Sequence, residues 1–291
     1  MIHANGLNFF LFLVIVGCSG APTAPDASAQ DDAGLPIDAG VVRDAASGPT
    51  VFVHLVSTHD PVAHAPATQG QTPRDWVSGI RSLHLLRRED DPAPLLVFSH
   101  GDGFVEGSYA DGADTIVGSA PIADLVPGTY TSARVVHTHV RFTIDATLHA
   151  GFGPMPGVLE DLLVLSDRTT LDGVERARGD YRFTFRTAGM SFPTEGSNFF
   201  IDPIAGGGFT TRVEEGETAY YFPVSLLVND RLTEDMHVYF EVNVHEGFRW
   251  TDSDMTDYEP GVFDMTPLGT EPIVQAGANT YSYRLSETAP P

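Results

Sequence analysis

Four aspartates near the C-terminus have a spacing that could serve a calcium ion: Asp252, Asp254, Asp257 and Asp264. Calcium takes six to eight hard oxygen ligands, and aspartates at alternating positions in a turn can supply several of them. The stretch is not an EF-hand, because Asp257 stands where that loop requires glycine and Phe263 stands at its last ligand position. The sequence therefore predicts either a looser calcium-binding loop or an acidic turn without a metal.

A pair of histidines offers a second kind of site. In an extended strand His137 and His139 would lie on one face, where two imidazoles can chelate zinc or copper. His84 and His149 are candidate third ligands, whereas Arg141 on the same face would repel a cation. The alternative is a solvent-facing strand on which histidine supplies polar surface in a chain without lysine.

The composition excludes several chemistries. All sixteen basic residues are arginine, so Schiff-base chemistry and the P-loop lysine are absent. A single cysteine rules out an internal disulfide, a thiolate zinc cluster and an iron–sulfur centre. The net charge of -23 argues against nucleic acid as a partner. Neither G-x-S-x-G nor H-E-x-x-H occurs, and with 39 acidic residues no carboxylate pair for glycoside hydrolysis stands out.

The single cysteine, Cys18, follows an apolar run at residues 7–17. That run is too short to span a membrane, which takes about 20 residues, and has the length of a signal-peptide core. Ile15-Val16-Gly17-Cys18 resembles the lipobox of bacterial lipoproteins. This resemblance implies that residues 1–17 are a signal peptide and that Cys18 carries a lipid anchor in the cell envelope, at the outer membrane. The alternative is an ordinary secretory leader that contains a cysteine.

The segment 18–49 is expected to be a disordered tether. Asp-Ala-Gly or Asp-Ala-Ala recurs every six residues from Asp32, and the segment has no aromatic residue. Such a composition cannot bury enough apolar surface to offset its ordering entropy. As a flexible coil it would reach roughly 30 Å, enough to hold a folded domain clear of a membrane.

Residues 50–286 alternate β-type patterns with Gly, Pro and Asp turns, which predicts an all-β fold, an antiparallel β-sandwich. It could be one large domain or two packed sandwiches divided near 150–157. In the clearest strand, 134–146, Val136, Phe142 and the other even-numbered residues are expected on one face and the odd-numbered residues on the other. Residues 76–87 and 158–165 fit helix and strand equally. Further strands are predicted at 50–57, 181–186, 219–228 with an edge or bulge at Pro223, 238–245 and 281–285.

Leu125-Val126-Pro127-Gly128-Thr129-Tyr130 resembles the entry into a long strand in bacterial surface lipoproteins of unknown function. The resemblance covers roughly residues 50–148 and implies a transthyretin- or immunoglobulin-like sandwich. The sequences FEVNVHEGFRW and GVFD are similar to the C-terminal part of uncharacterised secreted lipoproteins with Asp-Ala-Gly-rich tethers. These relatives imply an architecture and a location but carry no known active site.

The expected function is therefore non-catalytic binding by a lipid-anchored envelope protein, with a surface protein or a glycan as the ligand. The alternative is a metal-handling or hydrolytic envelope protein that uses His137, His139 and nearby acids. Aromatic residues close to the acidic stretch fit a sugar-binding face or the core equally: Phe248, Trp250, Tyr258 and Phe263.

Overall fold

A computed structural model of the protein describes residues 48–64, 67–151, 153–199, 208–229, 233–253 and 258–286. In these residues the regular elements are strands, apart from one short 3-10 turn, η1 (Ile122–Asp124). The predicted all-β, sandwich-like class is confirmed. The predictions for Cys18 and the tether, and those for Asp254 and Asp257, fall outside the described residues. No helix in the described part is long and apolar enough to cross a membrane.

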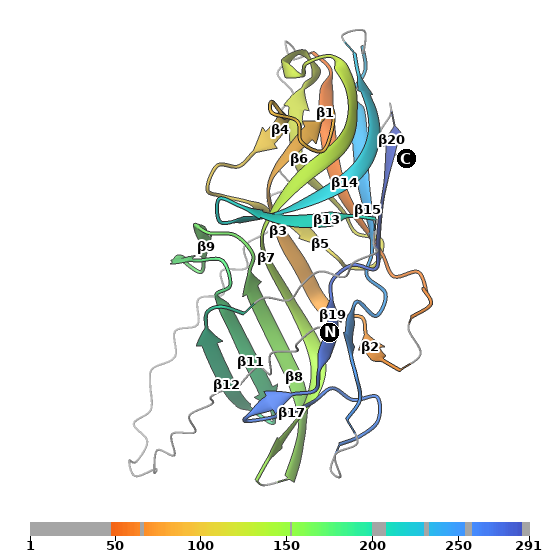
Figure 1. The fold of residues 1–291 in the computed structure, drawn as a ribbon. Coiled ribbons are helices and arrows are strands. Elements are labelled where there is room, and N and C mark those ends of the chain that lie inside the picture. Colours follow the sequence, from red (N-terminus) through yellow and green to blue (C-terminus); the bar gives the residue numbers. More distant parts are fainter. Residues whose placement is uncertain are drawn as a thin grey trace, which may run out of the picture.

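A four-stranded sheet forms one layer of the fold (Figure 1). Its strands, in spatial order, are β20 (Thr280–Ser286), β15 (Met236–Asn243), β1 (Thr50–Thr58) and β6 (Asp114–Pro121). β1 and β15 run parallel, with Val51 opposite Met236, whereas the other two pairs are antiparallel. The strands predicted at 50–57, 238–245 and 281–285 are thereby confirmed.

The largest sheet has eleven strands. Its main path is β12 (Met190–Gly196), β11 (Tyr181–Thr187), β8 (Gly153–Val164), β7 (Gly128–Ala150), β14 (Glu217–Val228) and β13 (Thr210–Glu214). Joined to it are β3 (Arg74–Leu86), β4 (Leu95–Ser99), β5 (Val105–Ser108), β17 (Asp264–Thr266) and β18 (Gly269–Thr270). Smaller groups are β2 (Gln69–Gln71), β16 (Phe248–Trp250) and β19 (Ile273–Ala276), and the hairpin β9 (Thr169–Leu171) with β10 (Val174–Arg176). The strands predicted at 181–186 and 219–228 are β11 and β14, and the register of β14 shifts after Pro223 as expected for a bulge.

The 23-residue strand β7 is the longest described strand and runs through both the upper and the lower part of the molecule (Figure 1). Along one edge it pairs with β14 as far as His137 and with β8 from His139 onward. β3 pairs along the other edge. The change of partner occurs at Thr138, whose carbonyl accepts hydrogen bonds from the backbone N–H groups of Leu165 and Ser166 at 2.8 and 3.2 Å.

The predicted alternation along 134–146 is wrong because β7 changes parity at this point. The register with β3 slips between Gly79 opposite His139 and Ile80 opposite His137, which leaves Thr138 as an extra residue. Before the slip Val135 faces the main core, and after it Phe142 does. The solvent-facing strand predicted for the histidines is also wrong, because His137 is 4% exposed and His139 is fully buried.

The two segments that fitted helix and strand equally are both strands, β3 and β8. β3 is buried along nearly its whole length from Trp76 to Leu86, and a strand covered on both faces loses the alternation by which strands are recognised. It also lies very close to β7, since a Cβ at Gly79 would clash with Thr138 Oγ1 and His139 Nδ1. Glycine is therefore required at position 79.

The entry into β7 is fastened by Tyr130. Its side chain is fully buried, and its hydroxyl donates a hydrogen bond to the carbonyl of Val126 at 2.7 Å. A tyrosine hydroxyl bonded to the backbone four residues upstream is the tyrosine corner of Greek-key sandwiches. The Pro127-Gly128 turn between the two residues brings them together.

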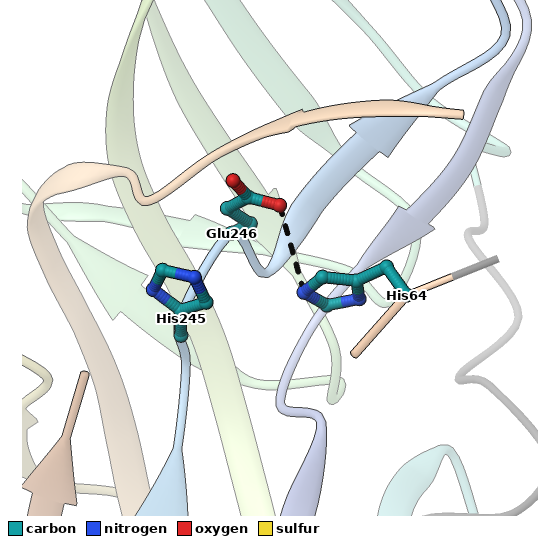
Figure 2. Close-up of side chains that lie close together, drawn as sticks. All are labelled: His64, His245 and Glu246. Carbon is teal, nitrogen blue, oxygen red and sulfur yellow. Dashed lines mark ion pairs between the residues drawn. The ribbon is translucent and has the colours of Figure 1, made fainter. Parts of the chain in front are cut away.

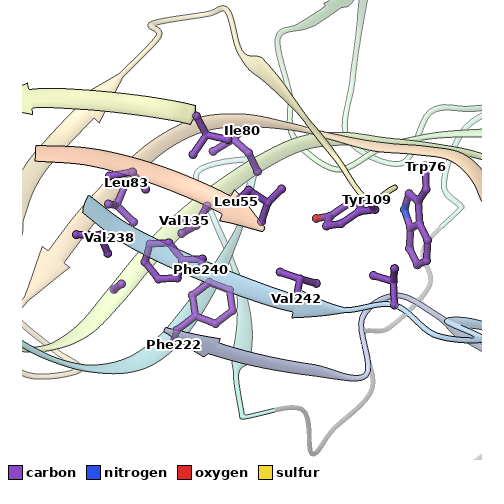
Figure 3. Packing of buried hydrophobic residues seen from close by; sticks show 14 of the residues in the cluster. Leu55, Trp76, Ile80, Leu83, Tyr109, Val135, Phe222, Val238, Phe240 and Val242 are labelled. Atoms are coloured by element: carbon purple, nitrogen blue, oxygen red, sulfur yellow. The ribbon is translucent and has the colours of Figure 1, made fainter. Parts of the chain in front are cut away.

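The main core lies between the four-stranded sheet and the β3–β7–β14 part of the large sheet (Figure 3). Leu55 of β1 and Phe240 of β15 meet Leu83 of β3, Val135 of β7 and Phe222 of β14 there. Full burial of each such side chain contributes about 1.5–3 kcal/mol. Residues 150–157, considered as a domain division, are the hairpin between β7 and β8, whose pairing runs without a break from His139 to Ala150.

Candidate ligand-binding cavity

A cavity of about 130 Å³ lies beside the C-terminal half of β7, from His137 to Leu148. Its lining comes from β7, β8, β11 and β12 of the large sheet and from the segment β17 to β20. Ligand sites in proteins are typically concave and largely apolar, with a few polar groups that fix orientation. Rings make up much of this lining: Trp76, Tyr109, Phe142, Phe183, Phe185, Phe192, Phe199, Phe209, Tyr220, Phe263 and Tyr281.

Strand register builds the aromatic wall. Leu159 of β8 stands opposite Phe185 of β11, and Phe185 stands opposite Phe192 of β12. Side chains directly across neighbouring strands share a face of the sheet. Because most of the residues at every second position in β8 and β11 are apolar, one face of this part of the sheet is mainly apolar. The segment that carries Phe263 and Met265 supplies further apolar lining.

Asp161 is the exception in this wall. It stands opposite Phe142 on one side and Phe183 on the other, and it is 7% exposed. Its Oδ1 has no hydrogen-bond partner among the described residues. Burial raises the pKa of the Asp161 carboxyl well above its usual range, which favours the uncharged form. A buried polar atom without a partner costs about 1–3 kcal/mol, so such a group calls for a functional explanation.

The other polar groups of the lining are uncharged. Burial raises the pKa of Tyr109 to about 12 and also raises the pKa values of Tyr220 and Tyr281. Burial, with a contribution from His139, lowers the pKa of His137 to about 3, so its imidazole is neutral near pH 7. Trp76 Nε1 has no hydrogen-bond partner within the described part of the chain. Asp161 is thus the lining group most readily charged by a suitable ligand.

The structure gives His137 and His139 different surroundings. The Ser78 hydroxyl donates to the carbonyl of His139 at 3.0 Å, and Ser78 Oγ is left to accept from His137 Nδ1 at 2.7 Å. His139 Nε2 lies 3.1 Å from Glu106 Oε1, and the same carboxylate accepts a bond from Arg141. In the described residues no group of three ligands forms around this pair. A metal held by the two histidines stays a prediction.

Of the two candidate third ligands, His149 is bound to another residue, whereas His84 Nδ1 has no hydrogen-bond partner among the described residues. His149 Nε2 lies 2.7 Å from Asp264 Oδ1, and its ring packs 4.7 Å from that of Tyr258. His84 is partly buried, and desolvation together with the charge of Arg134 lowers its pKa. Neither imidazole joins His137 in a ligand set within the described ranges.

The two described aspartates of the predicted calcium loop bind protein groups. Asp264 is fully buried, and its second oxygen accepts a hydrogen bond from the backbone N–H of Glu259 at 3.0 Å. Asp252 accepts from Trp250 Nε1 at 3.1 Å and from the backbone of Gly261. These carboxylates fasten the loop that follows β16, and the calcium site stays a prediction. Three of the four nearby aromatic residues belong to the core, as one of the two alternatives predicted: Phe248, Trp250 and Phe263.

Glu271 is a member of this loop network that the sequence did not single out. It accepts hydrogen bonds from the backbone of Ser253 at 2.7 Å and of Asp264 at 2.9 Å. Burial raises the pKa of the Glu271 carboxyl, and the nearby charges of Asp264 and Asp252 add to the effect. It therefore joins the two ends of the loop.

Figure 2 shows a cluster of three residues, none of which lines the cavity. His64, His245 and Glu246 each offer one ligand atom, and these atoms lie within 4.8 Å of one another. His64 Nε2 is 3.7 Å from Glu246 Oε2 and has no hydrogen-bond partner among the residues described. Burial and the nearby charge of Arg249 lower the pKa of His64, which favours its neutral imidazole. Arg249 also donates to Glu246 Oε2 at 2.8 Å, and its charge opposes a bound cation.

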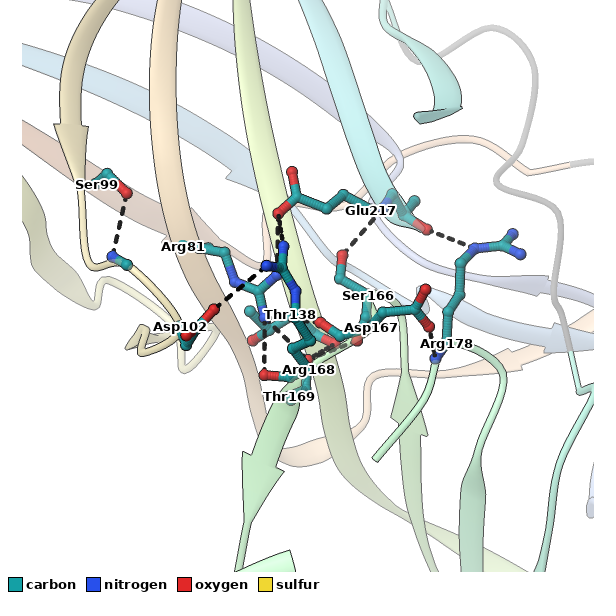
Figure 4. Close-up of polar contacts among 12 residues, drawn as sticks. Arg81, Ser99, Asp102, Thr138, Ser166, Asp167, Arg168, Thr169, Arg178 and Glu217 are labelled. Carbon is teal, nitrogen blue, oxygen red and sulfur yellow. Dashed lines mark hydrogen bonds and ion pairs between the residues drawn. The ribbon is translucent and has the colours of Figure 1, made fainter. Parts of the chain in front are cut away.

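A buried ion pair lies near the point where β7 changes partner (Figure 4). Arg81, 3% exposed, donates to Glu217 Oε1 at 3.0 Å and to the carbonyl of Asp167 at 3.0 Å. Arg168 lies 3.8 Å from the same glutamate. Because the charges are mutually compensated and bound to backbone groups, this network fastens the segment after β8 rather than forming an open site.

Comparison with known proteins gives no further guide to the chain. No family model, no curated protein and no solved structure matches it.

Proposed function

We propose that this protein binds a small apolar molecule in the aromatic cavity and does not transform it. The observation that carries the proposal is the lining itself: eleven aromatic side chains of the described residues surround a space of about 130 Å³. Transfer of apolar surface out of water into such a space is favourable by about 25 cal/mol per Å². Because burial lowers the pKa of His137 to about 3, its imidazole is a very weak base, and with the uncharged lining tyrosines it suits uptake of a molecule with little charge.

The size of the cavity limits the part of the ligand that it can enclose. A dry apolar cavity of about 150 Å³ in an engineered protein takes up benzene. At about 130 Å³ this cavity is slightly smaller, so the enclosed part corresponds to a single six-membered ring or a branched chain of similar bulk. A larger molecule would need to leave the rest of its length outside.

The location that we propose rests on the sequence. The order of apolar run, lipobox-like Cys18 and acidic tether supports a lipid-anchored binding protein in the cell envelope. The surface protein or glycan that we expected from the sequence is replaced in this proposal by a small apolar ligand. Mass spectrometry of the mature N-terminus tests the location: acylated Cys18 supports it, and an unmodified N-terminus contradicts it.

Isothermal titration with benzyl alcohol tests the binding function. We expect one saturable site in the wild type. Ala276→Leu adds bulk to the lining and should weaken binding by about 10-fold or more. The leucine side chain would occupy space that the ligand needs, and overpacking is strongly disfavoured. Ala93→Leu, an exposed alanine outside the lining, is the matched control and should bind as the wild type does. Equal affinity in all three proteins, or no saturable binding in the wild type, would contradict the proposal.

A second candidate function is metal binding, the alternative considered from the sequence, but at a different place. It is favoured by the convergence of His64, His245 and Glu246 and by the free nitrogen of His64. Two imidazoles and a carboxylate suit zinc. Zinc titration should lose its signal in His64→Ala and keep it in His137→Ala. The reverse pattern would support the pair predicted from the sequence, and no zinc binding would eliminate this candidate.

A further inference from the structure

We infer that the ligand of the cavity carries a protonated amino group, which Asp161 binds as a carboxylate while the apolar body lies among the rings. This inference rests on the proposed binding function and names the chemical class of the ligand. It follows from the isolation of Asp161, from its aromatic neighbours and from the charge of the chain.

Among the described residues, no cationic side chain pairs with Asp161. The described lining residues include no arginine, and the one histidine among them, His137, is held neutral by burial. Oδ1 of Asp161 is without a hydrogen-bond donor among the described residues. Buried carboxylates are normally paired with a cation or hydrogen-bonded, and removal of one partner is strongly destabilising. The carboxyl of Asp161 therefore needs a positively charged hydrogen-bond donor, and a ligand can supply one.

The neighbours of Asp161 suit an ammonium group. Phe142 and Phe183 flank it on the adjacent strands, and Phe199 packs against Phe183 with ring centroids 5.1 Å apart. A cation within about 6 Å of an aromatic ring is stabilised by the negative charge on the ring face. An anionic group gains nothing from the ring faces and would have to give up its hydration in an apolar cavity that offers no positive charge among the described residues.

The charge of the whole protein acts in the same direction. The formal net charge is -23, so the field around the molecule attracts cations and repels anions. A neutral alcohol could form a hydrogen bond with the Asp161 carboxyl. It would gain neither an ion pair nor the long-range attraction to the negative protein. The preferred order is therefore amine, then alcohol, then carboxylate.

Binding must move one proton. In the empty cavity the raised pKa of the Asp161 carboxyl favours its protonated form. An incoming R–NH₃⁺ group keeps its proton when it binds. When the O–H bond of Asp161 breaks, its proton passes to solvent, and an ion pair R–NH₃⁺···⁻OOC remains. No oxidant or co-reactant is needed. Amine affinity should therefore rise with pH until Asp161 is ionised in the free protein, whereas alcohol affinity should not rise.

Three molecules of similar shape test this inference: benzylamine, benzyl alcohol and benzoate. Titration calorimetry at about pH 8, below the range in which alkylamines lose their proton, should give benzylamine at least about a 10-fold advantage over benzyl alcohol. Benzoate should bind weakest. Repetition in buffers of different ionisation enthalpy should show proton release with benzylamine alone.

Asp161→Asn keeps the shape of the side chain and removes the negative charge. It should abolish the advantage of benzylamine and leave benzyl alcohol binding within about 3-fold of the wild type, which also shows that the variant is folded. Glu160→Gln is the matched control, because Glu160 is the preceding residue of β8 and pairs with Arg186 at 2.6 Å instead of lining the cavity. It should keep the amine preference.

The outcomes separate the two proposals. If benzyl alcohol binds as tightly as benzylamine, or if Asp161→Asn leaves benzylamine binding unchanged, the amine inference is overturned while the cavity function stands. If none of the three molecules binds at a saturable site, the proposed function fails and the amine inference fails with it.

Discussion

Asp161 stands directly across from Phe183 in the antiparallel pairing of β8 and β11, so a carboxyl and a phenyl ring share one wall of a buried cavity. A single-residue slip in the register would turn the carboxyl to the other face of the sheet. The structure instead holds it where it has no partner among the described residues. This placement lowers stability and, in our account, supports recognition of a ligand.

The first prediction concerns the stability lost at Asp161. Asp161→Leu should raise the free energy of unfolding near pH 7 by about 1–3 kcal/mol, because it removes a buried polar group without a partner. Urea denaturation followed by circular dichroism provides the measurement, with Glu160→Gln as a control that changes stability by less than about 1 kcal/mol.

The free energy of unfolding should depend on pH differently in the wild type and in Asp161→Leu. The carboxyl of Asp161 has a raised pKa in the folded state and an ordinary one of about 3.9 when unfolded. Above about pH 3.9 the unfolded chain therefore holds fewer protons than the folded one, and folding stability falls as pH rises. The advantage of Asp161→Leu should grow from acidic to neutral pH, and a constant advantage would disagree with a buried, protonated carboxyl.

A second prediction concerns His137. Its pKa is lowered to about 3 by burial, compared with about 6.5 in an unfolded chain. Between these values the unfolded state binds the additional proton, so His137 should reduce stability as pH falls from about 6.5 to about 3. His137→Gln should flatten this part of the stability curve, and the imidazole resonance of His137 should not titrate above about pH 5. Titration near pH 6.5 would show that the ring is solvated.

A third prediction concerns the tyrosine corner. Tyr130→Phe removes only the hydroxyl that donates to Val126 and should lower the free energy of unfolding by about 0.5–1.5 kcal/mol, the net contribution of one such hydrogen bond. Thermal and urea denaturation measure the loss. A change within experimental error would mean that the corner contributes shape but no stability.

A fourth prediction concerns the buried ion pair. Glu217→Leu removes the carboxylate from Arg81 and should cost about 3–5 kcal/mol. Arg81→Met should cost less, because Glu217 keeps Arg134 at 3.6 Å and Arg168 at 3.8 Å. The double variant should be more stable than Glu217→Leu alone. Equal losses in the two single variants would show that the pair is solvated.

The strands could be predicted wherever one face of a strand is solvated. Thr50–Thr58 and Tyr181–Thr187 show alternation, and the structure confirms them. β3 lacks that signal because it is buried on both faces. The parity change at Thr138 could not be predicted, since it is set by hydrogen bonds from Leu165 and Ser166, which lie far along the chain.

The candidate site was hidden for a related reason. Asp161 is one of 39 acidic residues, and only the strand register places it between Phe142 and Phe183. His64 and His245 come together from distant parts of the sequence, and no local spacing links them. Composition could exclude lysine and thiolate chemistry, but the cavity depends on the packing of separate strands.

Fluorescence of Trp76 reports directly on ligand binding in the cavity, because this indole lines the cavity whereas Trp250, the other tryptophan, does not. In a Trp250→Phe variant Trp76 is the only indole, and bromobenzene, whose heavy atom quenches a tryptophan on contact, can be titrated into it. We expect strong quenching of Trp76 fluorescence that saturates at one bromobenzene molecule per chain and is weakened by Ala276→Leu. Quenching that rises linearly without saturation, and equally in both proteins, would contradict the existence of a binding cavity.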